Sequence, residues 1–443
     1  MTEHAICFQC IKDEHLREIV ESKGEPLKCE VCGGKDANAF TYSQLGEELQ
    51  LVIREHFHQG PTVKKFYDDD KEGWEQEGDS LAYVVQMVLG QDVEEEGKLV
   101  SAVIAAEHYY PGDGEDAFYD DTSLYVRRKA TPHELTAEWQ YLQEELAHRR
   151  RFFSESARVL FNRLFDGVPQ LEVWDAEADA WAPVVYELPV GTHVSRARVV
   201  KSESQLRDIV NHPSRELGAP PAALSVSGRM NPNGIVVFYA AMDRETCLAE
   251  MRPPLGGRVL AGTFRTTLPI RVLDFRRLEK ARLAELSYFD PQFASERERA
   301  VFLRRLHALI SRPVIPGRED DYLITQTLSE YLAHIHQPLL DGVLFRSVQR
   351  AGGTNIVLFG RDGFEVGAQP DGDLAELPFP LLGAMMDSAS PTLEFPVEFV
   401  QNSAKLFITR AIEYEHHEAW FSVHEGHVFV HDDDGDEGFD EDD

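Results

Sequence analysis

The sequence predicts an α+β protein built from three successive kinds of segment. Four cysteines lie in two C-x-x-C pairs near the N-terminus, apolar residues then recur at helical spacing, and short apolar strands later alternate with helices. This order predicts a small metal-stabilised module, an all-α domain, and a mixed β core with flanking helices. The expected boundaries are 1–40 for the module, 41–170 for the helical domain, 171–186 for a linker, 187–360 for the mixed domain, 361–431 for a β-rich extension and 432–443 for an acidic, disordered tail.

Length and composition restrict the class of protein. With 443 residues, of which 43% are hydrophobic, the chain can form two or three domains with substantial cores. Its formal net charge of −33 argues against a general nucleic-acid binder, which needs a basic face. The sequence lacks an apolar run of about 18 residues that would span a membrane, and its first residues, MTEHAICFQC, do not resemble a signal peptide. We therefore expect a cytoplasmic protein without a membrane partner.

The cysteine spacing predicts a structural zinc site. The two C-x-x-C pairs are separated by 18 residues, and four thiolates at such spacing can surround a zinc ion tetrahedrally. Gly33 and Gly34 follow the second pair and fit the tight turn of a zinc knuckle. The alternative is a set of buried or redox-active thiols, because structural disulfides do not suit a cytosolic protein. The expected zinc ligands are Cys7, Cys10, Cys29 and Cys32.

Residues from Thr41 to about Phe165 carry apolar side chains at helical spacing. The sequence Thr131–Glu134 fits a capping box that opens one of the later helices. This region, in which ELAHRRRFF leads into the last helix, resembles the HEPN-like domain that precedes RES domains in some bacterial proteins. Catalytic HEPN domains cleave RNA with an Arg-x4-6-His motif, whose spacing Arg128 and His133 fit. A helical scaffold or sensor is the other interpretation.

The third segment is organised around Ser227–Arg252. A polar loop leads into the apolar run Ile235–Tyr239, which predicts a buried strand. Asp243 then has the character of an N-cap for a short helix that carries Glu250, and Cys247 on that helix is expected to be a small buried apolar residue. Loop, strand and helix are therefore expected to bring Tyr239 near Glu250.

A strand is also predicted at His193–Val200, with Arg196 and Arg198 on one face because alternate residues of a strand point the same way. Two guanidinium groups on one face could bind a diphosphate, and the alternative is a charged, exposed edge. The remaining predicted strands are Val259–Phe264, Ile270–Phe275, Gly342–Phe345 and Thr354–Phe359, and the predicted helices are Ser295–Ile310 and Tyr322–Ile335.

Three motifs of the third segment occur in the order found in one family. They are RARV, then GRMNPNGIVVFYAA with ETCLAEM, then DGVLFRSVQRAGGTNIVLF. With them, Glu187–Gly360 resembles the RES domain, named for an Arg, a Glu and a Ser. The resemblance implies a fold like that of ADP-ribosyltransferases and consumption of NAD by hydrolysis, phosphorolysis or transfer of ADP-ribose. Ala197 stands where some members carry an aromatic residue after the motif arginine.

The resemblance also implies roles for individual residues. A carboxylate beside the ribose would stabilise an oxocarbenium-like transition state, and an aromatic ring would stack on the cationic nicotinamide. On this interpretation the catalytic residues are Glu250, Arg196 and Ser347, and the NAD-binding residues are Tyr239, Arg198, Gly228, Arg229 and Asn231.

These observations together predict a RES-domain toxin that consumes NAD, in a toxin–antitoxin or phage-defence setting. The zinc module and the helical domain are expected to regulate or localise it, since they show no convincing chemistry of their own. The expected partners are NAD, an antitoxin or other regulatory protein, and a second copy of the chain in a homodimer. Two alternatives stay open, namely a HEPN-type RNase with a regulatory RES domain and a catalytically idle module that senses a nucleotide.

Overall fold

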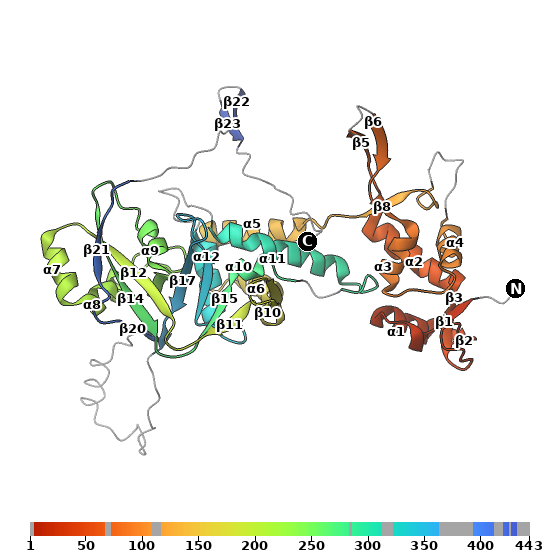
Figure 1. The fold of residues 1–443 in the computed structure, drawn as a ribbon, viewed down its shortest axis with the longest axis horizontal. Helices are drawn as coiled ribbons and strands as arrows, with labels where there is room; N and C mark the ends of the chain where they lie inside the picture. The colour runs from red at the N-terminus through yellow and green to blue at the C-terminus, as the bar shows by residue number, and fades with distance from the viewer. Residues whose placement is uncertain are drawn as a thin grey trace, which may run out of the picture. The chain divides into compact units, whose positions relative to one another are not determined.

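A computed structural model describes residues 4–66, 72–108, 117–282, 286–311, 322–362, 393–411, 420–424 and 427–431. The chain forms two compact units, and Figure 1 labels many of their elements. The expected acidic tail at 432–443 lies outside the described residues. The first unit comprises Met1–Leu188, Val226–Ile235 and Arg271–Phe345, and the second comprises Pro189–Ser225, Val236–Ile270 and Arg346–Asp443.

The N-terminal part of the first unit has one main hydrophobic core that joins the strands beside the cysteines to the helices after them, whereas Cys7 and Cys29 pack in a smaller cluster with Ala5 and Ala39. Strand β3 lies between β1 and β2, and Thr41 caps the following helix in a capping box with Gln44. Ile6 and Phe40 share one hydrophobic cluster with Leu49, so the core continues across residue 40. The elements are β1 (Ala5–Cys7), α1 (Glu14–Lys23), β2 (Glu25–Pro26), β3 (Asn38–Thr41), α2 (Tyr42–His56), α3 (Leu81–Leu89) and α4 (Glu96–Ala105).

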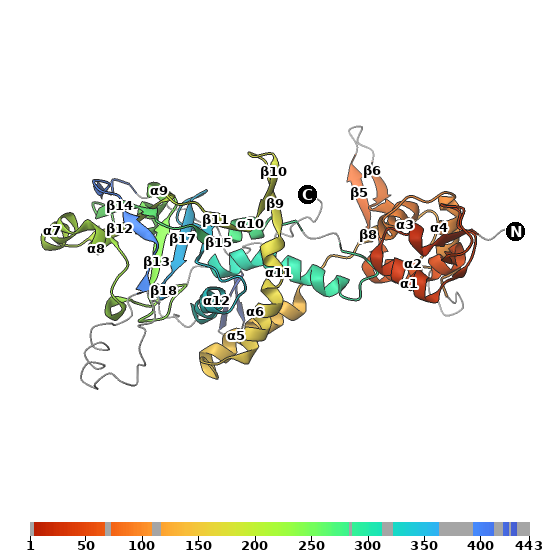
Figure 2. The ribbon, with the colours of Figure 1, turned by 90° about the horizontal axis from the view of Figure 1, so that it is seen from below.

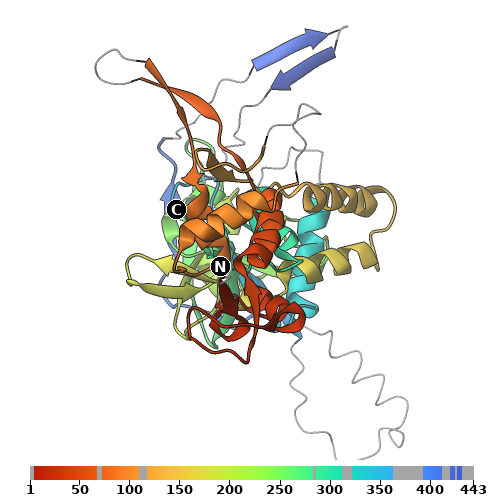
Figure 3. The same cartoon turned by 90° about the vertical axis from the view of Figure 1, so that its right-hand side faces the viewer.

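The region from Thr41 to Phe165 is not all-α, contrary to the expectation. A three-stranded sheet has the order β4-β8-β7, and a separate β5–β6 hairpin extends away from α2–α4 (Figure 3). These strands are short and are rich in β-branched and aromatic residues, such as Val63 and Trp74, so they lack the long apolar periodicity that reveals helices. Their bounds are β4 (Phe57–Gln59), β5 (Thr62–Phe66), β6 (Glu72–Gln76), β7 (Asp79–Ser80) and β8 (Leu124–Arg127).

Two later helices of this region pack on helices from the third segment (Figure 2). Trp139 contacts Phe302 with ring centroids 5.6 Å apart, and Phe161 contacts Tyr331 at 5.5 Å. The expected capping box does not form, because the helix begins at His133 after Pro132, which offers no capping side chain. The four helices are α5 (His133–His148), α6 (Glu155–Phe165), α11 (Phe293–Ser311) and α12 (Leu323–His334).

The expected linker at 171–186 is instead largely a β-hairpin. Trp174 and Trp181 are paired across it, with ring centroids 5.4 Å apart. Within the first unit, strands β11, β15 and β16 lie side by side in that order, and β15 and β16 run parallel. The elements are β9 (Glu172–Asp175), β10 (Ala180–Pro183), β11 (Val185–Leu188), β15 (Ile270–Asp274), α10 (Phe275–Leu278) and β16 (Gly342–Arg346).

The second unit contains an antiparallel sheet with the strand order β17-β13-β12-β14-β20, and β21 also pairs with β14. Strands β12 and β17 have the bounds predicted for them, and β13 and β14 differ from prediction by one or two residues at their ends. The elements are β12 (His193–Val200), α7 (Glu203–Asn211), α8 (Pro213–Leu217), β13 (Val237–Ala241), α9 (Arg244–Glu250), β14 (Arg258–Thr266), β17 (Thr354–Phe359), β20 (Val397–Phe399) and β21 (Lys405–Ile408).

The described part of the C-terminal extension is β-structured, as predicted. Two short antiparallel pairs form, and the second is the hairpin predicted around residues 425–426. These pairs are β18 (Arg361–Asp362) with β19 (Leu393–Glu394), and β22 (Trp420–His424) with β23 (His427–His431).

Candidate functional site

Helix α9 carries the carboxylate at the centre of the candidate site. Asp243 begins this helix as predicted, because its side chain accepts a hydrogen bond of 2.8 Å from the backbone N–H of Thr246. Cys247 is 4% exposed and packs with Ala197, which confirms that it is a buried apolar residue. Glu250 is the last residue of α9. The helix therefore holds its carboxylate at the end that leads into the next loop.

Two donors hold one oxygen of the Glu250 carboxylate. The Ser347 hydroxyl donates to Oε1 at 2.6 Å, and the Asn355 side-chain amide donates to the same oxygen at 2.7 Å. The Ser347 oxygen in turn accepts a hydrogen bond of 3.1 Å from the backbone N–H of Gln349. Among the described residues, neither donor reaches Oε2. The structure thus brings together two predicted site residues that lie 97 positions apart in the sequence.

Asn355 is a site residue that the sequence analysis missed. Only its polar side chain in the apolar strand TNIVLF could have pointed to it. Asn355 is paired with Ala241 across β17 and β13, and Val357 is paired with Tyr239. Because alternate residues of a strand point to the same face, Tyr239 lies on the same face of the sheet as Asn355. The half-buried Tyr239 therefore lies on the face of the sheet that carries Asn355, two residues along β13 from the partner of Asn355.

The loop that carries Ser347 contacts both ends of α9. Arg350 donates from Nη1 to Asp243 at 3.2 Å and to the Thr246 hydroxyl at 3.1 Å. A Cβ atom added to Gly353 would lie 2.5 Å from that hydroxyl, so this position has no room for a side chain. The loop therefore contacts α9 at its N-terminal end through Arg350 and at its C-terminal end through Ser347.

The Arg196 guanidinium lies where β12 and β13 separate. These strands form one residue pair, Ser195 with Ala241, whereas β12 pairs with β14 along its whole length. Arg196 donates from Nη1 to the Tyr239 carbonyl at 3.0 Å, and its guanidinium lies 4.6 Å from the Phe238 ring centroid. Its Nε is buried and has no hydrogen-bond partner among the described residues.

The two strand arginines share one face of β12, and the charge of Arg198 affects the pKa of Arg196. Burial, and next the positive charge of Arg198, lowers the pKa of Arg196 to about 9. Burial likewise lowers the pKa of Arg198, whose Nη2 donates to the Gly218 carbonyl at 3.2 Å. Ala197 packs toward Cys247 of α9, so by alternation Arg196 and Arg198 point to the other face of β12. The structure thus does not place Arg196 in the hydrogen-bonded group around Glu250.

The loop expected to line the mouth of the NAD site lies in the first unit and is held against α12. Gln326 of α12 donates to the carbonyls of Gly228 at 2.8 Å and Asn231 at 3.1 Å. The Asn231 side-chain amide donates to carbonyls of its own loop, and Arg229 donates to the carbonyl of Ile310. These contacts give Gly228, Arg229 and Asn231 a structural role in shaping the loop.

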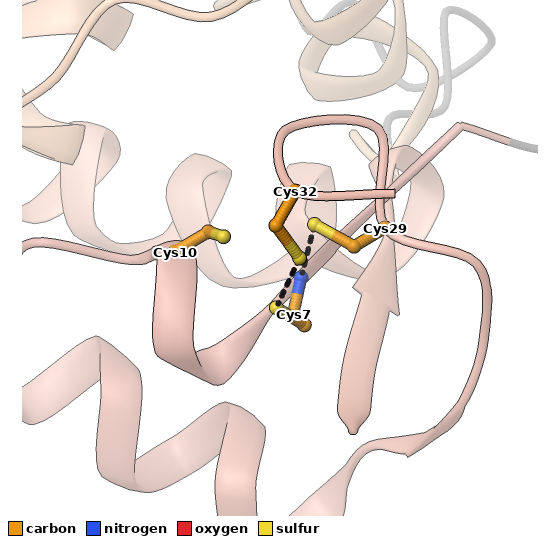
Figure 4. Close-up of side chains that lie close together, drawn as sticks. All are labelled: Cys7, Cys10, Cys29 and Cys32. Carbon is orange, nitrogen blue, oxygen red and sulfur yellow. Dashed lines mark hydrogen bonds between the residues drawn. The ribbon is translucent and has the colours of Figure 1, made fainter. Parts of the chain in front are cut away.

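The four N-terminal cysteines form a cluster that could bind a metal ion. Their sulfur atoms lie within 4.8 Å of one another, and Figure 4 shows the side chains converging from β1, the turn after it and a second loop. The Cys7 backbone N–H donates to the Cys29 sulfur at 3.4 Å. Gly33 has φ of +73°, which confirms the predicted tight turn. Burial alone would raise the pKa of Cys29, but hydrogen bonds from the Cys32 and Cys7 backbone lower it to about 7.

The two residues of the HEPN-type spacing are exposed. Arg128 donates from Nη2 to the Arg54 carbonyl at 3.4 Å, and His133 is the first residue of α5. These contacts show what holds Arg128 in place and assign no chemistry to it.

Comparison with known proteins identifies one domain. Residues 197–381 match the model of the RES domain, a family associated with NAD-related toxins, and as a class its members act on NAD. The matched range contains Glu250, Ser347 and Asn355 and begins one residue after Arg196. Neither the curated proteins nor the solved structures gave a match to this chain. In the part of the chain that the structure describes, no helix has the length and apolar character needed to cross a membrane.

Proposed function

We propose that this protein consumes NAD by cleaving the bond between nicotinamide and ribose. The observation that carries the proposal is the Glu250 carboxylate, which lies inside the RES match with Oε1 bound by Ser347 and Asn355. Both donors act on one oxygen, so Oε2 is left for a ligand. A carboxylate with one oxygen fixed and the other accessible suits a reaction in which positive charge develops close by.

The chemistry of NAD fits such a site. Nicotinamide leaves as a neutral molecule from a cationic pyridinium, so its departure needs little help from an acid. The ribose then carries oxocarbenium-like charge, and Glu250 stabilises that charge or holds the 2′-hydroxyl through Oε2. Tyr239, on the same face, stacks on the pyridinium ring. Water, phosphate or a protein nucleophile then completes hydrolysis, phosphorolysis or ADP-ribosyl transfer.

Ser347 is proposed to act through Glu250. Its hydroxyl hydrogen is donated to the carboxylate, and its oxygen accepts the Gln349 N–H. The one donor of the hydroxyl and one of its two acceptor positions are therefore in use. In this arrangement the residue orients the carboxylate, and neither a nucleophilic attack nor a bond to the nicotinamide amide is assigned to it.

Arg196 and Arg198 are proposed to hold the diphosphate of NAD. They are close enough for the charge of Arg198 to lower the pKa of Arg196, and burial disfavours both charges. A bound anion would offset both effects, and the buried Nε of Arg196 would gain a partner. These side chains point to the face of β12 away from α9, so in this proposal the dinucleotide contacts both faces of the strand.

We also propose roles for the rest of the chain. Four thiolates within 4.8 Å of one another favour zinc as the structural metal of the N-terminal core. We propose that this core and the HEPN-like helices α5 and α6 regulate the RES domain. An antitoxin and a second copy of the chain are the proposed protein partners.

The deciding experiment is incubation of the purified full-length chain with NAD and separately with total RNA. Nicotinamide release, followed by identification of ADP-ribose, ADP-ribose 1″-phosphate or a labelled protein, supports the proposal and names the reaction. RNA cleavage that is lost in His133→Ala, without NAD loss, replaces it with the RNase alternative. NAD binding without turnover replaces it with a nucleotide-sensing module.

A further inference from the structure

We propose that Asn355 is a positioning residue that holds the Glu250 carboxylate so that Oε2, and not Oε1, faces the substrate. This inference rests on the proposed function and assigns a residue outside the Arg, Glu and Ser after which the domain is named. The geometry points to it because Asn355 and Ser347 approach the same oxygen, at 2.7 Å and 2.6 Å.

The two donors come from different elements and fix different degrees of freedom. Asn355 lies within β17, where it is 9% exposed and is paired with Ala241, so the sheet determines its place. Ser347 lies in the loop after β16, where its hydroxyl also accepts the Gln349 N–H. A single donor would leave the carboxylate free to rotate about its terminal torsion, which has a broad minimum. A second donor on the same oxygen removes that rotation.

The consequence concerns turnover more than binding. Glu250 interacts with charge that develops on the ribose in the transition state, so a misdirected carboxylate lowers kcat while NAD still binds through its other groups. A hydrogen bond to a charged group is worth about 1.5–3 kcal/mol, which corresponds to roughly a 10- to 100-fold change in rate. We expect Asn355→Leu, which keeps the approximate volume but has no donor, to lower kcat by about that factor.

The test is steady-state NAD turnover of Asn355→Leu and Asn355→Asp in the full-length chain, with NAD binding by calorimetry. Asn355→Asp keeps the shape but sets a second carboxylate against Glu250, so its kcat should fall at least as far as that of the Leu variant. For both variants we expect kcat to fall while the Kd for NAD changes by less than about threefold. Asn211→Leu, the same substitution at an exposed site at the end of α7, should match the wild type.

A purely structural role would give a different pattern. It would lower the melting temperature and would raise the Kd and lower kcat together, and that outcome overturns the inference. Unchanged kcat in Asn355→Leu also overturns it. The double variant Ser347→Ala with Asn355→Leu should lose less than the product of the two single losses, because both donors hold one oxygen.

Failure of the proposed function is distinguishable from failure of the inference. If the wild type does not consume NAD, the proposed function is wrong. The positioning role is then judged by a crystal structure of Asn355→Leu, in which we expect the Glu250 carboxylate to rotate away from its wild-type orientation. A carboxylate that keeps its place without Asn355 contradicts the inference whatever the activity.

Discussion

At the scale of single residues, the chemistry of the site depends on how the polar side chains are already engaged. Ser347 uses its donor and one acceptor position, Asn231 uses its amide to hold its own loop, and one oxygen of Glu250 accepts two hydrogen bonds. The order of polar residues in the sequence does not show which hydrogen bonds each side chain makes. The hydrogen-bond partners in the structure show which groups are already engaged, because each side chain has a small, fixed number of donors and acceptors.

The first prediction concerns Glu250. Glu250→Gln keeps the volume and removes the charge, so NAD turnover should fall by roughly 10²- to 10³-fold, as is typical when one preorganised electrostatic partner is lost. NAD binding should change little, because the charge matters mainly in the transition state. Steady-state NAD loss and calorimetry measure the two effects. The control is Glu245→Gln, an exposed position in the first turn of the same helix. Near-wild-type turnover in a folded Glu250→Gln variant would falsify the assigned role.

At the scale of elements, the close packing of α2 on α4 depends on a single glycine. Helix α2 approaches α4 at Gly46, where an added Cβ would lie 2.7 Å from the Ala102 backbone. Helix α4 also contains Gly97, where an added Cβ meets no atom within 4 Å. Glycine is therefore required by close packing at Gly46 of α2, whereas Gly97 of α4 has room for a side chain.

The second prediction uses this contrast. Gly46→Ala should destabilise the N-terminal core by about 1–3 kcal/mol, because the backbone of α4 must move to accept the methyl group. Gly97→Ala should stabilise it by about 0.5–1 kcal/mol, because alanine costs less backbone entropy in a helix. Hydrogen exchange of the α2 and α4 amides measures both changes. Equal effects of the two substitutions would contradict the packing described for α2 and α4.

At the scale of the whole molecule, the N-terminal core also takes in a segment of the RES match. Phe289 belongs to its hydrophobic cluster, and Ser287 donates to the Asp13 side chain at 3.0 Å. Residues near 286–293 therefore connect the cysteine-bearing core with helix α11. The proposed regulation could act through this contact, because a structural change in the N-terminal core would displace the residues that precede α11.

The third prediction concerns the metal. The purified protein should contain about one zinc ion per chain, since four thiolates complete one tetrahedral site. Cys29→Ser should unfold the N-terminal core as far as α4, because the strands beside the cysteines contribute Ile6 and Phe40 to the cluster that contains residues of α2 and α4. Elemental analysis and hydrogen exchange check both statements. Finding no metal and four freely reactive thiols under reducing conditions would disprove the site.

The fourth prediction concerns fragments of the chain. A fragment that starts at Trp181 loses α5 and α6 and uncovers Phe302 and Tyr331, so we expect it to aggregate. A fragment that starts at Thr131 keeps those helices and should remain folded, with higher NAD turnover than the full chain if the N-terminal core restrains activity. Size-exclusion chromatography and NAD turnover test this. Equal turnover of the Thr131 fragment and the full chain would rule out restraint by the N-terminal core.

The sequence by itself determined the local features of this protein. The strand at His193–Val200, the helix capped by Asp243 and the four-cysteine cluster were all predicted from short-range signals. Such signals succeed because propensity, capping and turn chemistry act over a few neighbouring residues. A family resemblance implied that Glu250 and Ser347 are both site residues, and the structure joins them by a hydrogen bond.

Only the tertiary structure decided which distant surfaces meet. It placed Asn355 on Glu250, and it packed α5 and α6 on α11 and α12 although a boundary had been expected between them. It also turned the Arg196 guanidinium toward the Tyr239 carbonyl, on the other face of β12 from Ala197. The physical reason is that an apolar stripe or a lone polar side chain specifies that a partner is needed without specifying which one. That choice is made when all such faces are buried at once.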